Sequence, residues 1–116
     1  MLTHGPAKKV TVYVGEDVRH RGEALYLAVL NYLFYHGVSG ATVTKGVAGF
    51  GPDHRLHTAR ILEASENLPI TVTIIDSEEK IQRFLPAVEQ MVTEGLVAIS
   101  DVDIIRYAHR AEHTGE

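Results

Sequence analysis

Apolar and polar side chains alternate in several separate stretches of the chain, and a period of two predicts β-strands. The alternation is clearest in residues 8–14, which end at Gly15, and in residues 70–75, where isoleucine and valine alternate with threonine. Residues 96–107 predict the last strand, with a bend expected at residues 100–101. These stretches predict the strands of a small sheet.

A further strand is predicted over residues 41–50, and it runs into the glycine-rich stretch KGVAGFGPDHRLHTAR at residues 45–60. Ala41, Val43 and Val47 would share one face of this strand. The pattern that follows, residues 57–65, is compatible with an extension of the next strand or with a short helix, and the sequence does not decide between them.

Two stretches between the strands predict helices. The first covers residues 23–36 and ends at Gly37, because a glycine commonly follows the last turn of a helix. The second begins at Asp76, with Glu79 three residues later at the spacing of a capping box, and ends at Gly95. Pro86 lies inside it and predicts a kink. Its apolar stripe consists of Ile81, Leu85, Val88 and Val92.

The order of these elements is β-α-β-β-α-β, which predicts an α+β fold of the ferredoxin-like kind. Two helices would cover one face of a four-stranded antiparallel sheet. With 116 residues the chain is long enough for a single domain. We expect the domain core at residues 8–107 and a flexible tail at residues 108–116.

This topology predicts that three connecting segments meet at one end of the sheet. They are residues 15–22 after the first strand, residues 49–56 after the second, and residues 94–96 before the last. The first two carry most of the local charge, and binding residues concentrate in loops held by a rigid scaffold. The charged and ionisable side chains are Glu16, Asp17, Arg19, His20 and Arg21 in the first segment, Asp53, His54 and Arg55 in the second and, just beyond it, His57 and Arg60.

Two interpretations of the glycine-rich stretch stay open on the residues alone. Glycines let backbone N–H groups approach an anion closely, and Arg55 and Arg60 could add bidentate contacts to phosphate or carboxylate. The alternative is a hairpin that needs glycines for its turn and carries solvated charges at its tip. No Gly-Lys-Ser/Thr follows the glycines, so the stretch is not a Walker loop.

Two surfaces of the predicted fold are unusually apolar for a monomer. On the first helix, Leu25, Ala28, Val29 and Tyr32 form the core stripe, while Leu27, Leu30 and Phe34 lie on the opposite side. A second apolar stripe favours contact with another protein surface. The sheet face away from the helices would carry threonine and tyrosine, namely Thr11, Tyr13, Thr42, Thr44, Thr71 and Thr73. This composition fits packing of the sheet against further copies of the chain.

Composition and charge narrow the classes of function. The formal net charge of −4 argues against nucleic acid as a partner, because binding to a phosphate backbone needs a positive surface. The absence of cysteine excludes disulfides, thiol catalysis and cysteine-held metals. Neither a run of eighteen apolar residues nor an apolar signal segment is present, which predicts a cytoplasmic protein.

Several motifs together resemble a PII-like family known as domain of unknown function 190. They are GED at residues 15–17, GATV.KG.AGFG at residues 40–51, LP at residues 68–69 and DS.EKI at residues 76–81. The resemblance covers residues 8–107, and it is the combination of motifs that is specific.

The resemblance implies a ferredoxin-like subunit that forms a homotrimer, as PII signalling proteins do. It also implies an adenine nucleotide as the ligand, bound in clefts between subunits, and a target protein, often a membrane transporter, that contacts the loop after the second strand. Gly49, Phe50 and Gly51 resemble the Gly-Phe-Gly at the base of that loop. This chain departs from PII proteins in its short loop, which has no tyrosine, and in residues 93–95, where a glycine- and lysine-rich phosphate segment would stand.

We therefore expect a regulatory binding protein that senses a small anionic ligand. A trimeric metal-binding protein and a structural adaptor without a ligand are the alternatives. His54, His57, Asp53 and Glu16 have the ligand types for a metal, and His109 and His113 would share a helix face only if the tail were helical. The candidate ligand-binding residues are Arg19, Gly46, Gly49, Phe50, Gly51, His54, Arg55, His57 and Arg60.

Catalysis is the least favoured interpretation. His20, His54 and His57 could act with Glu16 or Asp17 in a hydrolase-type reaction. Their spacing singles out no nucleophile–base pair, so we predict that the protein is not an enzyme.

Overall fold

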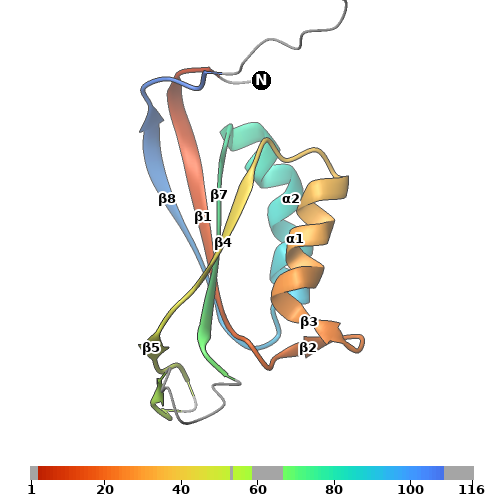
Figure 1. The fold of residues 1–116 in the computed structure, drawn as a ribbon. Helices are drawn as coiled ribbons and strands as arrows, with labels where there is room; N and C mark the ends of the chain where they lie inside the picture. The colour runs from red at the N-terminus through yellow and green to blue at the C-terminus, as the bar shows by residue number, and fades with distance from the viewer. Residues whose placement is uncertain (1–2, 53, 59–66, 109–116) are drawn as a thin grey trace, which may run out of the picture.

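The computed structural model describes residues 3–52, 54–58 and 67–108. Its main sheet has four antiparallel strands in the order β4-β7-β1-β8. Both helices cover one face of this sheet, as Figure 1 shows. The predicted α+β, ferredoxin-like βαββαβ sandwich is therefore confirmed. The elements of the sandwich are β1 (Gly5–Gly15), α1 (Leu25–Tyr35), β4 (Ala41–Lys45), β7 (Pro69–Asp76), α2 (Glu78–Met91) and β8 (Leu96–Ile104).

Two short hairpins complete the described structure. In the first, β2 (Arg19–His20) pairs with β3 (Glu23–Ala24) just before α1. In the second, β5 (Ala48–Gly49) pairs with β6 (His57–Thr58) beyond the end of β4. Each strand has two residues, too short for an alternation of side chains to be detected in the sequence.

The core lies between the sheet and the helices and follows the period-two pattern of the strands. Alternate valines of β1 and alternate isoleucines and valines of β7 are almost completely buried, while the residues between them face away from the helices. Burial of each such side chain stabilises the fold by about 1.5–3 kcal/mol. The core cluster is Val10, Val12, Val14, Leu25, Val29, Leu33, Ile70, Val72, Ile74, Ile81, Phe84 and Val88.

The first helix begins two residues later than predicted, because Glu23 and Ala24 pair with β2 instead. It ends at Tyr35, and Gly37 follows with a positive φ of 82°, as expected of a glycine after a helix. Leu33 is buried in the core stripe, whereas Tyr32, predicted there, is only half-buried.

The predicted start of the second helix is wrong by one residue. Ser77 caps α2, and its side chain accepts a hydrogen bond from the Lys80 N–H. Asp76 is buried at the end of β7, where its carboxylate accepts from the backbone N–H groups of Ser39 and Ser77 at 3.0 and 2.8 Å. Asp76 therefore joins the α1–β4 turn to the start of α2. Pro86 lies within α2, and the helix continues to Met91.

The strand predicted over residues 41–50 is interrupted. It ends at Lys45, opposite Ile70. The Gly46 N–H still donates to the Pro69 carbonyl at 2.7 Å, but Pro69 has no N–H to donate in return, and the ladder stops there. Ala48 and Gly49 then pair with His57 and Thr58, and the rest of residues 57–65 lies outside the described residues.

The bend predicted at residues 100–101 is absent. β8 is continuous, since both residues are in register with β1: Ser100 lies opposite Lys9 and Asp101 opposite Lys8. The predicted flexible tail lies outside the described residues from 109 onward. In the described part of the chain, no helix combines the length and apolarity needed to span a membrane.

Candidate functional site

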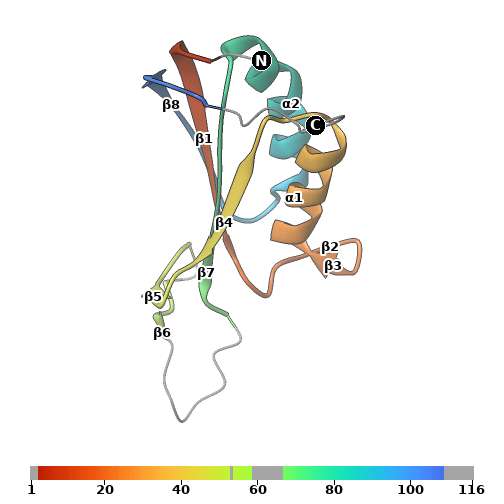
Figure 2. The same ribbon diagram turned by 45° about the horizontal axis from the view of Figure 1, so that its top comes forward.

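A cleft of about 910 Å³ lies where the three predicted segments meet. Gly15, Asp17 and Val18 come from the loop after β1, and Gly46, residues 48–52 and His57 come from the glycine-rich segment. Glu94, Gly95 and Leu96 come from the turn before β8. Figures 1 and 2 both show the three segments at the same end of the sheet. The chain order thus predicted the position of the cleft.

The floor of the cleft is the outer face of the sheet. Tyr13 of β1 and Thr71 of β7 lie directly opposite each other and both line it, as does Leu96, which is opposite Tyr13 on β8. The lining is mainly apolar apart from these hydroxyl groups and a few ionisable side chains. An apolar cleft with a few polar groups is the usual form of a small-molecule site.

Glycines form one wall because the chain passes very close to Pro69. A Cβ on Gly46 would lie 2.8 Å from Pro69 Cγ, and a Cβ on Gly49 would lie 3.1 Å from the same atom. Real Cβ atoms do not approach to 2.8 Å without a shift of their neighbours. Part of the glycine content of this segment is therefore explained by packing on Pro69.

An ion pair joins the loop after β1 to the end of β4. Lys45 Nζ lies 2.8 Å from Glu16 Oε2, and the Leu68 N–H donates to Glu16 Oε1 at 3.4 Å. The backbone N–H of Glu16 donates in turn to the Leu68 carbonyl at 3.0 Å. The hydrogen bond from Lys45 lowers the pKa of Glu16 below its usual value, and the Leu68 N–H acts in the same direction.

Asn67 connects two walls of the cleft. Its Oδ1 accepts from the backbone N–H of Asp17, and its Nδ2 lies 3.4 Å from His57 Nε2. Sequence reasoning did not name this residue. It placed residues 94–96 at this end of the sheet and Tyr13 on the outer face, but it included neither Glu94 nor Tyr13 among the ligand-binding residues. The one available signal for Asn67 was its place directly before the Leu-Pro motif at residues 68–69.

The structure brings together only part of the predicted ligand set. Gly46, Gly49, Phe50, Gly51 and His57 line the cleft.

Arg19, His54 and Arg55 are not among its lining residues. Arg19 lies in the hairpin beside α1, and His54 packs edge-to-face on Phe50 with the ring centres 5.1 Å apart. Arg60 lies outside the described residues. The binding role of each of these residues stays a prediction.

The charge of the cleft differs from the positive charge expected of an anion site. The described lining residues include the carboxylates of Asp17 and Glu94 and the imidazole of His57, but no lysine or arginine. Backbone N–H groups and side chains around the rim would therefore have to attract an anion. Where the chain is described, no group of three histidine, aspartate or glutamate side chains is placed to hold a metal ion. Asp53, His109 and His113, which the metal alternative used, lie outside those residues.

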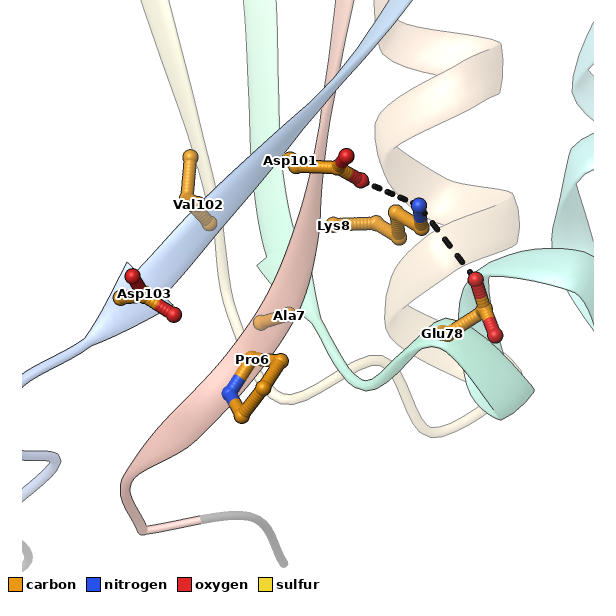
Figure 3. A pocket seen from close by; sticks show the side chains of 7 residues that line it. All are labelled: Pro6, Ala7, Lys8, Glu78, Asp101, Val102 and Asp103. Atoms are coloured by element: carbon orange, nitrogen blue, oxygen red, sulfur yellow. Dashed lines mark hydrogen bonds and ion pairs between the residues drawn. The ribbon is translucent and has the colours of Figure 1, made fainter.

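A smaller hollow of about 460 Å³ lies at the opposite end of β1 (Figure 3). Lys8 projects between Asp101 of β8 and Glu78 of α2 and forms ion pairs with both. The hydrogen bonds that the Lys8 ammonium group donates to these two carboxylates, Asp101 foremost, raise the pKa of Lys8. The lysine is thus already paired, and its contacts tie the edge strand to the second helix.

Comparison with known proteins identifies relatives and a shared fold. The model of the DUF190 family, described as "Uncharacterized ACR", matches residues 7–104. A UPF0166 protein of Aquifex aeolicus is 33% identical over 98 residues, covering 84% of this chain and 92% of that protein. A UPF0166 protein of Methanocaldococcus jannaschii is 34% identical over 101 residues, covering 86% and 93%.

Among solved structures, the chain is similar to CPII of Thiomonas intermedia K12, a nitrogen regulatory PII-like protein bound to ADP, AMP and bicarbonate. The TM-score is 0.61 and the sequence identity 20%, with 91% of this chain and 94% of that chain covered. At this identity the comparison shows a common fold.

Proposed function

Because the chain belongs to the DUF190 family, we propose that it is a PII-like regulatory protein that binds a small anionic ligand, an adenine nucleotide, in the cleft. The observation that carries the proposal is the cleft itself, which three loops from different parts of the chain form at one end of the sheet. CPII, which shares the fold, is a nucleotide-bound protein, and this supports the choice of ligand.

The lining suits the parts of a nucleotide. Phe50, with 64% of its surface exposed, and Tyr13 offer aromatic surfaces for a base. At Gly51 nothing lies within 4 Å of an added Cβ, so a ligand can approach the backbone there. Arg55 lies four residues beyond Gly51 and is our candidate for contact with a phosphate at the rim.

We propose that the protein assembles as a homotrimer through the outer face of its sheet. On this face Thr42, Thr73, Thr11 and Ala98 lie opposite one another across all four strands. The next row consists of Thr44, Thr71, Tyr13 and Leu96, and the last three of these residues also form the floor of the cleft. We therefore place the first row, which carries no charge, inside the interface and the ligand at the edge of that interface.

The glycine-rich loop is our candidate surface for a target protein. Val47 lies between the lining residues Gly46 and Ala48, Leu56 directly precedes the lining residue His57, and the two side chains are 75% and 70% exposed. Exposed apolar side chains on a loop next to a ligand site can report ligand binding to a partner. This role follows from the proposed ligand site and would be tested after it.

Thermal unfolding with and without adenine nucleotides tests the ligand. A ligand at one hundred times its Kd stabilises the native state by about 2.7 kcal/mol, so AMP or ADP should raise the melting temperature. Gly51→Leu should abolish the shift by filling the cleft. Gly40→Leu is the matched control, because Gly40 also has open space around an added Cβ and lies outside the cleft. If no adenine compound shifts the wild-type protein, the proposed function is wrong.

Light scattering after size-exclusion chromatography tests the assembly. We expect three times the 12.8 kDa mass of one chain. Thr73→Glu places a charge in the middle of the threonine row and should yield monomers. Gln82→Glu adds the same charge on the exposed face of α2 and should leave the trimer intact. A monomeric wild-type protein would contradict the proposed assembly.

A further inference from the structure

We propose that the cleft selects against phosphate charge, so that it binds adenosine monophosphate or diphosphate more tightly than the triphosphate. The inference rests on the proposed function and deepens it, because it concerns the ligand of the same cleft. The observations that carry it are the carboxylates in the lining and the pairing of the neighbouring lysine.

Two carboxylates enter the cleft from different elements. Asp17 belongs to the loop after β1 and Glu94 to the turn before β8, and both residues are exposed. No lysine or arginine accompanies them in the lining that the structure describes. His57 supplies the one imidazole in this described lining.

The lysine next to the cleft does not balance these charges. Lys45 directly precedes Gly46 of the lining, but its ammonium group lies 2.8 Å from Glu16 Oε2. The pKa of Glu16 is lowered, first by the hydrogen bond from Lys45, so this carboxylate remains ionised at neutral pH. The pair is close to neutral as a unit. Among the described lining residues Asp17 and Glu94 therefore remain as two negative charges, and the positive charge of Arg55 at the rim can offset only one of them.

Carboxylates at these positions favour the ribose of a nucleotide over its phosphates. A carboxylate oxygen accepts hydrogen bonds from hydroxyl groups, and this is how acidic side chains hold the ribose of many nucleotides. The same oxygens repel phosphate. At separations of several ångströms near a protein surface, each added phosphate charge should weaken binding about three- to tenfold.

Isothermal titration calorimetry with AMP, ADP and ATP tests the inference. The titrations use the 116-residue chain at constant ionic strength without divalent cations, since a bound cation would neutralise the phosphates. The ratio of the ATP Kd to the AMP Kd should be about ten or more. It should shrink in high salt, because exposed charges are screened.

Charge-neutralising variants distinguish the effect of the cleft carboxylates on binding from the effect of the protein's net charge. In the double variant Asp17→Asn, Glu94→Gln the ratio should fall about three- to tenfold, with both side chains keeping their shape. Asp103→Asn is the control. Asp103 lies on the same sheet but lines the hollow at the opposite end, so its neutralisation should leave the ratio unchanged. Circular dichroism would verify that all the variants are folded.

Each outcome has one meaning. Equal or tighter binding of ATP by the wild-type protein, or a ratio that the double variant leaves unchanged, would overturn the charge selection while nucleotide binding stands. If AMP, ADP and ATP all fail to bind, the proposed function is wrong, and the charge selection fails with it.

Discussion

Replacement of Gly95 by alanine should destabilise the fold more than any other single methyl addition to the cleft. Gly95 has a φ of 144°, a conformation that side-chain-bearing residues rarely adopt. A Cβ there would lie 2.5 Å from the Tyr13 carbonyl oxygen and 2.9 Å from Val14 Cγ1. Because the first of these atoms belongs to the backbone of the central strand β1, it cannot turn aside as a flexible side chain would.

The loss of folding free energy in the Gly95→Ala variant follows from two unfavourable contributions and one favourable contribution. Backbone strain at a positive φ costs about 1–3 kcal/mol. Overpacking by a methyl group costs about 1–3 kcal/mol. Alanine also restricts the unfolded chain, which returns about 0.4–1 kcal/mol. The net loss is about 1–5.6 kcal/mol, equivalent to a fall in melting temperature of roughly 4–22 °C for a domain of this size.

Thermal unfolding followed by circular dichroism, at equal protein concentration for all variants, measures this loss. Gly40→Ala is the control, because an added Cβ there has no neighbour within 4 Å and Gly40 has no positive φ. The control should change the melting temperature by no more than about 4 °C. A Gly95→Ala protein that melts within the same margin would refute the packing of the turn against β1.

Three further substitutions test the contacts that organise the loops. Lys45→Met should reduce the stability of the protein at pH 7 by about 0.2–1 kcal/mol, since both partners of the Lys45–Glu16 pair are partly exposed. The folded-state pKa of Glu16 lies below its usual value near 4.5, so the pair stabilises the fold above that value. The difference between variant and wild type should therefore disappear as the pH falls through the lowered pKa, and a pH-independent difference in urea denaturation would contradict the ion pair. Asp76→Asn replaces one of two acceptor oxygens by a donor that faces a backbone N–H, and should cost about 1–3 kcal/mol; a loss below 0.5 kcal/mol in the same assay would exclude this role. Ser77→Ala removes the cap of α2 and should cost about 0.5–2 kcal/mol, whereas Ser100→Ala, on an exposed strand position, should be nearly neutral.

The sequence by itself determined the elements that bury a face. Val10, Val12 and Val14 repeat at the strand period because every second side chain of β1 must face the helices. The same argument holds for Ile70, Val72 and Ile74 in β7. Once the order of strands and helices was known, the topology required the three loops to meet at one end, and the cleft lies there.

Only the tertiary structure decided which residues make up the site. Asn67 and Glu94 carry no periodic signal, and they enter the cleft because strands far apart in the chain bring their loops together. Lys45 was part of a locally basic stretch in the sequence, yet Glu16, twenty-nine residues earlier, neutralises it. In the same way, Asp76 looked like a helix cap but is held by the distant Ser39 N–H, and Ser77 takes the cap.

The physical reason is the range of the interactions. Burial of a face imposes a repeat on neighbouring residues and is visible in any short window of the sequence. A hydrogen bond or an ion pair depends on atoms within about 3–4 Å, and their partners come from anywhere in the chain. The fold therefore follows from local patterns, whereas the charge of the cleft depends on contacts that only the folded chain creates.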